Sequence, residues 1–333
     1  MLSKRDAYVD VLRGIAIICV AFGHAIQKCN CMIPTDSVQS IIATFQMALF
    51  FAISGYVSCY SDAEPLMVLK RRVFRLLVPY LSWVILLCAV QSKWGDLPHL
   101  ILNSQFWFLR VLFLVSIVVT VSVAIGRKLL NANKKSFLVG TGVLVAILGC
   151  GVEYALGQRA LTHYLVCYVM GILAFYLTRR QREWPFRIML KSSVVIFALQ
   201  CICWRYIPSG MVSAWRHLMA LSGSLSMCYC SCLICDSLAE RNVLTRTLSL
   251  LGRESLSIYA VHWNVFFLLF PLPLVVQVEN RFLFYVSSIL VCIVWLLASV
   301  GAAYVLRKVP MLSELFLGER HAVGVKDAGR RRA

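Results

Sequence analysis

Residues 10–24 read Asp10-Val-Leu-Arg13-Gly-Ile-Ala-Ile-Ile-Cys-Val-Ala-Phe-Gly-His24, an apolar run that carries three ionisable side chains. Inside a membrane-spanning helix such side chains are costly, and they mark a functional site by default. Asp10 and Arg13 are three residues apart and can pair on one helix face. Arg13 and His24 are eleven apart, so they share that face at a separation of roughly 16 Å along the axis. The alternative is that Asp10 and Arg13 lie at the membrane interface while His24 packs as a neutral polar residue.

The remainder of the chain has the same membrane character. Of its 333 residues, 60% are hydrophobic, and several apolar runs approach the roughly 20 residues that cross a bilayer. We predict an all-α polytopic bundle with a single integral-membrane domain over residues 1–310 and a short basic tail over 311–333. No cleaved signal peptide is expected, because the first apolar run carries charges. Ten transmembrane helices are expected, at 8–26, 38–59, 74–91, 106–125, 136–152, 161–177, 188–207, 214–234, 255–275 and 282–305.

The basic residues predict the orientation of this bundle. Of the 33 Lys and Arg residues, 25 flank one set of alternate helix ends and 6 the other, with Arg13 and Arg110 inside helices. Because cytoplasmic loops carry the excess of Lys and Arg, both termini are expected in the cytoplasm. The same spread over alternate loops argues against a nucleic-acid partner for the net charge of +18. Most of the 14 cysteines lie in apolar runs, where they act as small hydrophobes, and no metal site is expected.

A basic motif precedes the third expected span: Lys70-Arg71-Arg72-Val-Phe-Arg75-Leu-Leu-Val-Pro79-Tyr80. Arg72 and Arg75 are three residues apart on one helix face, and paired guanidinium groups of this kind can grip phosphates. The alternative is a topology signal, since basic residues flank most cytoplasmic helix ends.

The fourth expected span opens at the outer face with Phe106-Trp107-Phe108-Leu109-Arg110. An interfacial aromatic belt with a snorkelling arginine accounts for this motif. The alternative is an aromatic platform for a sugar ring at Trp107, with Arg110 near an acceptor.

The ninth expected span begins with Leu251-Gly252-Arg253-Glu254-Ser255-Leu-Ser-Ile-Tyr259-Ala-Val-His262. Ser255, Tyr259 and His262 follow the spacing i, i+4 and i+7, so they line one helix face. Three polar residues in register predict one wall of a polar pocket. A single one would be explained as a helix–helix hydrogen bond.

Taken together, these motifs resemble the acyltransferase 3 family of bacterial integral-membrane acyltransferases, in order over residues 10–262. Arg13 with His24 is similar to the family's arginine-x10-histidine signature. The Trp107-Phe108-Leu109 element is similar to that of the fucose 4-O-acetylase-like branch. The other matches are Phe50-Phe51-x-x-Ser54-Gly55-Tyr56, Arg72-x-x-Arg75-Leu-x-x-Pro79-Tyr80 and Gly252-x-x-Ser255-x-x-x-Tyr259-x-x-His262.

The resemblance implies transfer of an acyl group, usually acetyl from cytoplasmic acetyl-CoA, to a hydroxyl of a cell-envelope glycan or lipid-linked sugar. It implies a bacterial cytoplasmic-membrane location. The residues suit that task, because a neutral His24 can take the proton of an attacking hydroxyl. Direct transfer and an acyl-histidine intermediate both stay open, as does the oligomeric state. The implied site comprises His24, Arg13 and Asp10 for catalysis, Arg72, Arg75, Ser54, Ser255, Tyr259 and His262 for the donor, and Trp107 and Arg110 for the acceptor.

Two other classes of protein compete with this interpretation. A secondary transporter would explain the Asp, Arg and His of the first span, but transporter folds usually show an internal repeat, and none is visible. A receptor or scaffold protein would leave the polar helix faces unexplained.

Overall fold

The fold is known from a computed structural model, which describes residues 7–29, 36–60, 63–92, 94–129, 134–157, 161–179, 183–237, 242–269 and 280–319. All regular structure in these ranges is helical. The α-helices are α1 (Ala7–Cys29), α2 (Ser37–Ser58), α3 (Pro65–Arg72), α4 (Val78–Gln91), α5 (Leu97–Asn103), α6 (Trp107–Leu129), α7 (Lys134–Leu156), α8 (Leu161–Arg179), α9 (Glu183–Cys203), α10 (Val212–Ser237), α11 (Val243–Leu269), α12 (Arg281–Arg307) and α13 (Pro310–Leu312). Two π-helical turns, η1 (Val73–Leu77) and η5 (Ser313–Leu317), and three 3₁₀ turns, η2 (Trp94–Asp96), η3 (Trp204–Tyr206) and η4 (Ser209–Met211), complete it.

The π-helical turn η1 joins α3 to α4 into one continuous rod. Proline at position 79 has no backbone N–H to offer the carbonyl four residues earlier, which is that of Arg75. The helix widens there, and the N–H of Val78 bonds to the carbonyl of Val73, five residues back. Single π turns of this kind occur often at functional sites.

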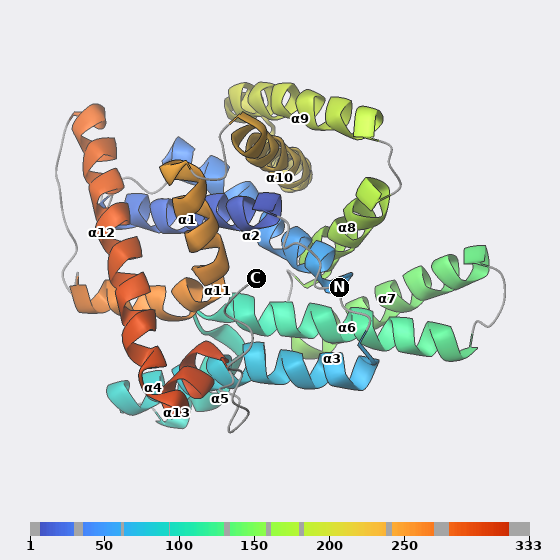
Figure 1. Cartoon of the computed structure of the whole chain (residues 1–333), viewed down its shortest axis with the longest axis horizontal. Helices are drawn as coiled ribbons and strands as arrows, with labels where there is room; N and C mark the ends of the chain where they lie inside the picture. The colour runs from blue at the N-terminus through green and yellow to red at the C-terminus, as the bar shows by residue number, and fades with distance from the viewer. Residues whose placement is uncertain are drawn as a thin grey trace.

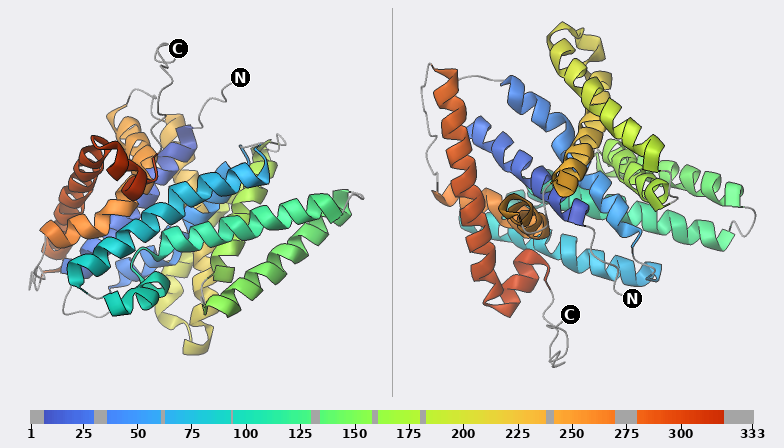
Figure 2. Two further views of the ribbon diagram at one scale, coloured as in Figure 1. Left: turned by 90° about the horizontal axis from the view of Figure 1, so that it is seen from below. Right: turned by 45° about the horizontal axis from the view of Figure 1, so that its top comes forward.

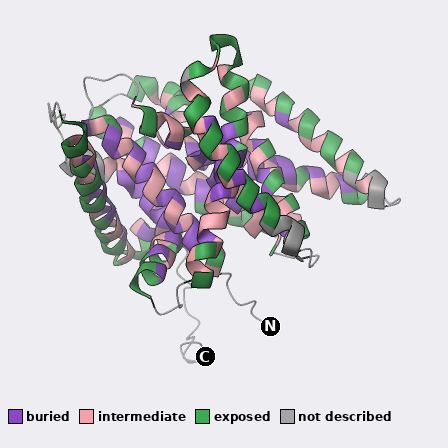
Figure 3. Cartoon of the chain, turned by 90° about the horizontal axis from the view of Figure 1, so that it is seen from above, coloured by how far each residue is buried: buried purple, intermediate pink, exposed green. Residues whose placement is uncertain are grey.

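The helices form one bundle around α1 and α2 (Figure 1). Helices α11 and α12 pack against α1 and against each other, and α11 crosses α1 in Figure 1, where α9 and α10 pack together above them. Two further views in Figure 2 show α3 and α4 running beside α6. Buried residues gather in the middle of the bundle, and the outer helices are mostly exposed (Figure 3). The most buried part of α1 includes Ala16, Ile17, Val20, Ala25 and Ile26.

Two helix pairs approach so closely that only glycine fits at the contact. A Cβ on Gly252 of α11 would overlap the carbonyl of Asp10 on α1, and one on Gly14 would overlap the carbonyl of Leu248. Gly55 of α2 and Gly171 of α8 make the same kind of contact with each other's helix. Small residues let membrane helices pack backbone to backbone. The approach of α1 to α11 brings two polar helix faces together.

The predicted polytopic helical membrane bundle is confirmed. Among the described residues, seven helices are long and apolar enough to cross a membrane, and two shorter apolar stretches are Leu161–Leu177 and Ile188–Cys203. Helix α11 falls outside this set because polar residues such as Arg253, Glu254 and His262 interrupt its apolar sequence. The predicted start of this helix, residue 255, was wrong, since α11 begins at Val243. The expected residues 270–275 of that span lie outside the described ranges.

Candidate active site

A cavity of about 620 Å³ lies between α1, α2, the α3–η1 rod, α6 and α11. It brings together residues from every motif that the sequence singled out, and from the aromatic motif at the start of α6 it takes Phe108. The predicted site residues that line it are Asp10, Arg13, Ser54, Arg72, Arg75, Ser255 and Tyr259. Predicted site residues up to 249 positions apart in the sequence, Asp10 and Tyr259, therefore share one cavity.

One wall of the cavity carries the acid–base pair of α1. Asp10 is buried, and its carboxylate lies 3.9 Å from the guanidinium of Arg13, as the three-residue spacing predicts. The close contact at Gly252 sets this pair directly against the start of the polar face of α11.

The cavity has a strongly basic lining. Arg71, Arg72 and Arg75 all reach it, because positions i, i+1 and i+4 fall within about 100° of one another around a helix with 3.6 residues per turn. Arg13 and Arg253 add two more guanidinium groups, and Asp10 is the one acidic residue among the described lining residues. Sequence reasoning missed Arg71 and Arg253, although both stand within motifs that it quoted. A cavity with this charge is suited to a ligand that carries several phosphates.

The cavity lining also contains apolar side chains. Phe50, Ile53, Phe108 and Leu112 are buried, whereas Arg71, Arg75 and Arg253 are exposed, so the basic residues lie nearer the surface than the apolar ones. A basic mouth that leads to an apolar interior can hold a phosphorylated carrier at one end and a short acyl chain at the other. Among the described residues, no group of three His, Cys, Asp or Glu side chains is placed to hold a metal ion.

The two predicted histidines form a separate cluster. The ring centroids of His24 and His262 are 5.8 Å apart, and Trp263 and Trp295 lie 5.3 Å and 5.9 Å from His24. The indole N–H of Trp295 donates to the backbone carbonyl of His262 over 2.6 Å. Sequence reasoning missed both tryptophans, because neither follows the spacing of the polar motifs.

The side-chain contacts of His24 suit a proton acceptor. Its Nδ1 lies 3.0 Å from Oε1 of Gln27, an amide oxygen that accepts a hydrogen bond. With the proton held on Nδ1, the lone pair on Nε2 is available for a proton from another group. His262 is more deeply buried, and its Nδ1 donates to the carbonyl of Tyr259 over 2.5 Å.

Tyr259 connects the cavity to the histidine cluster. It lines the cavity, and its ring lies 4.9 Å from that of His262 and 4.8 Å from that of Phe108. Tyr259 and His262, on one face of α11, therefore connect the cavity lining to His24.

Trp107 and Arg110 do not line the cavity. Trp107 is half-buried, with its ring 5.3 Å from that of Tyr164. Arg110 is 7% exposed, donates to the carbonyl of Ile101 over 2.7 Å and lies 5.9 Å from the centre of the Tyr80 ring. These contacts place Arg110 inside the protein, where it binds the backbone of α5.

Comparison with known families decides the class of this protein. The profile of the acyltransferase 3 family, described as an acyltransferase domain, matches residues 6–304. The chain belongs to the acyltransferase 3 family. This acyltransferase is thus an enzyme of the membrane, and the transporter and scaffold alternatives are set aside. No curated protein and no solved structure matches the chain significantly.

Proposed function

We propose that this membrane acyltransferase transfers an acetyl group from cytoplasmic acetyl-CoA to a hydroxyl of a cell-envelope glycan or lipid-linked sugar in a bacterial cytoplasmic membrane. The observation that carries the proposal is the cavity with five arginines and one acid, joined through Tyr259 to the histidine cluster. Coenzyme A carries several phosphates on a long neutral arm that ends in a thioester. Such a donor matches a basic mouth followed by an apolar interior.

In this mechanism the arginines hold the nucleotide and His24 acts on the acceptor. Arg71, Arg72, Arg75 and Arg253 bind the phosphates, and the pantetheine arm extends past Ser54 and Ser255 towards Tyr259. The hydroxyl oxygen attacks the thioester carbonyl carbon while Nε2 of His24 takes its proton. The C–S bond then breaks, coenzyme A leaves as the thiol or thiolate, and the sugar carries the new ester. Arg13, paired with Asp10, orders the donor at the cavity wall.

Isolated membranes that contain the protein are expected to transfer radiolabel from [¹⁴C]acetyl-CoA to glycan or lipid-linked sugar. Membranes from the same host without the protein serve as the control, and alkaline treatment should release the label because an O-acetyl ester is base-labile. Absence of label above the control, in membranes that hold the acceptor and the protein, would rule out an acetyl-CoA-dependent reaction.

We further propose that the basic mouth of the cavity faces the cytoplasm and that both termini lie there. The distribution of the basic residues over alternate helix ends supports this orientation. The acceptor then approaches from the other face, where α6 begins at Trp107. Because a nucleotide is too highly charged to cross hydrocarbon, the two substrates meet inside the bundle.

Cysteines at two matched acidic positions test this orientation. Glu64 precedes α3 and Asp96 precedes α5, and both are exposed. In a background without reactive thiols, Asp96→Cys should react with an impermeant maleimide added to intact cells, whereas Glu64→Cys should react only after the membrane is opened. The reverse pattern would place the cavity mouth outside the cytoplasm.

A further inference from the structure

After α12, residues Pro310–Glu319 fold back onto the bundle; we refer to them as the C-terminal segment. Leu317 is 2% exposed, and the indole N–H of Trp83 on α4 donates to the carbonyl of Phe316 over 3.1 Å. The rings of Trp83 and Phe316 are 4.7 Å apart. The family profile ends at residue 304, so these contacts lie beyond the part of the chain that it matches.

The C-terminal segment touches the backbone of a cavity arginine. Gly318 has a φ of +69°, a left-handed conformation that favours glycine. A Cβ at this position would lie 2.8 Å from Cα of Arg75 and 2.8 Å from the carbonyl oxygen of Phe74. Gly318 is therefore in direct contact with the π turn that carries Arg75.

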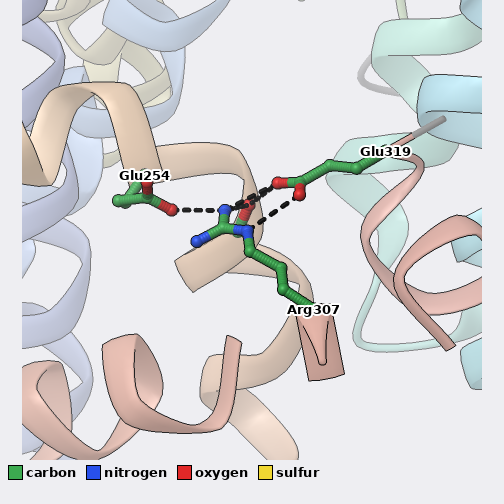
Figure 4. A network of polar contacts seen from close by, with 4 residues as sticks. Glu254, Arg307 and Glu319 are labelled. Carbon is green, nitrogen blue, oxygen red and sulfur yellow. Dashed lines mark hydrogen bonds and ion pairs between the residues drawn. The ribbon is translucent and has the colours of Figure 1, made fainter. Parts of the chain in front are cut away.

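The next residue, Glu319, attaches the C-terminal segment to α11 and Arg307, on the other side of the cavity from Arg75 (Figure 4). Glu319 accepts hydrogen bonds from Nε and Nη2 of Arg307, at 2.8 Å and 2.6 Å, and from the hydroxyl of Ser257 at 3.1 Å. The same Nη2 donates to Glu254 over 2.5 Å. The Arg307 guanidinium holds the pKa of Glu319 below its usual range.

These contacts end on both sides of the cavity. Glu254 and Ser257 alternate along α11 with the lining residues Arg253, Ser255 and Leu256. Gly318 meets the opposite wall at Arg75. The C-terminal segment thus spans from the π turn to α11 and is in contact with elements on both sides of the cavity.

We propose that the C-terminal segment positions the donor-binding arginines: Gly318 sets the place of Arg75, and Glu319 holds the segment to α11 through Arg307. The inference rests on the proposed function, because the arginines are taken to bind coenzyme A. Gly318 and Glu319 are positioning residues, and neither lines the cavity.

Gly318→Ala tests the backbone contact, with Gly157→Ala as its matched control. Gly157 also has a positive φ, of +61°, but a Cβ there would meet nothing within 4 Å. Both variants carry the same backbone strain, and only Gly318→Ala pushes on Arg75. Because the loss of one hydrogen bond between charged groups costs about 10-fold or more in affinity, we expect the affinity of the full-length purified protein for coenzyme A to fall by about 10-fold or more in Gly318→Ala alone.

Glu319→Gln tests the attachment, with Glu314→Gln as its control. Glu314 lies on the same segment and is exposed, so its substitution removes the same charge without loosening the network. We expect Glu319→Gln to weaken coenzyme A binding several-fold, and Glu319→Asp to restore part of it. If Glu319 acted only as a competing anion near Arg75, its neutralisation would tighten coenzyme A binding, and that result would overturn the proposal.

Thermal unfolding of each variant separates positioning from plain stability. A structural role alone would lower the Tm of Gly318→Ala and Glu319→Gln and leave the affinity of the folded protein unchanged, which would refute the inference while the proposed function stands. Wild-type protein that binds no coenzyme A would instead refute the donor assignment, and the inference with it.

Discussion

His24→Ala is expected to reduce acyl transfer by about 100-fold to 10,000-fold, the usual cost of removing a general acid or base, while the protein still accumulates in the membrane. The reason is the availability of Nε2 in the cluster with His262, Trp263 and Trp295. His24→Gln should lose as much activity, because an amide can hydrogen-bond but cannot take up the proton. The measurement is initial rate of radiolabel transfer in vesicles, normalised to the amount of protein.

His99→Ala is the matched control for this variant. His99 is exposed on α5 and does not line the cavity, so its loss should leave the rate unchanged. A His24→Ala protein with most of its activity intact would contradict the assignment of His24 as the base. Activity in His24→Gln alone would show that His24 acts as a hydrogen-bonding residue.

Arg72→Ala and Arg75→Ala are expected to raise the KM for acetyl-CoA by about 10-fold to 100-fold each. The estimate follows from the roughly 1.5–3 kcal/mol carried by a hydrogen bond to a charged group. Lysine at either position should recover only part of the loss, since an ammonium group cannot offer two parallel N–H donors to one phosphate. Donor titrations at saturating acceptor provide the measurement.

Arg127→Ala separates donor binding from membrane orientation. Arg127 stands in the last turn of α6, is exposed and lies outside the cavity lining. Like Arg72 and Arg75, it is one of the basic residues that flank the expected cytoplasmic helix ends. If these arginines served only to orient the protein in the membrane, the three variants would have the same KM for acetyl-CoA. Unchanged KM values in Arg72→Ala and Arg75→Ala would show that both arginines only help to set the membrane orientation and do not bind the donor.

The local features of the fold could be predicted from the sequence. Apolar runs of spanning length predicted the helices, and the three-residue spacing predicted the Asp10–Arg13 pair that the structure contains. The start of α11 was not predictable in this way, because Arg246, Arg253 and Glu254 give its first turns the composition of a cytoplasmic loop. The structure accommodates those charges, since Arg246 and Arg253 are exposed and Glu254 has Arg307 as its partner.

The assembly of the site depended on contacts that sequence spacing does not encode. Nothing local in the sequence pairs Gly252 with Asp10, or places Arg253 in the same cavity as Arg71. The π turn at η1 had a signal in Pro79, but its effect on Arg75 depends on the C-terminal segment that packs against it. Long-range helix packing therefore determines which members of a motif share a cavity.

The contact between α1 and α11 also has a consequence for biosynthesis. Gly14 and Gly252 are separated by 238 positions in the chain. At about 5–20 residues per second, the ribosome needs roughly 10–50 s to make the interval between them. For that time α1 stands in or near the bilayer without the helix that later covers its polar face.

The pairing of Asp10 and Arg13 within one helix meets this condition. Because both charges belong to α1, they can neutralise each other before any later helix has been inserted. A partner for Asp10 on α11 alone would leave a lone carboxylate exposed to lipid throughout translation, at a substantial cost. The pair thus lowers the cost of keeping α1 in the membrane before α11 has been synthesised and inserted.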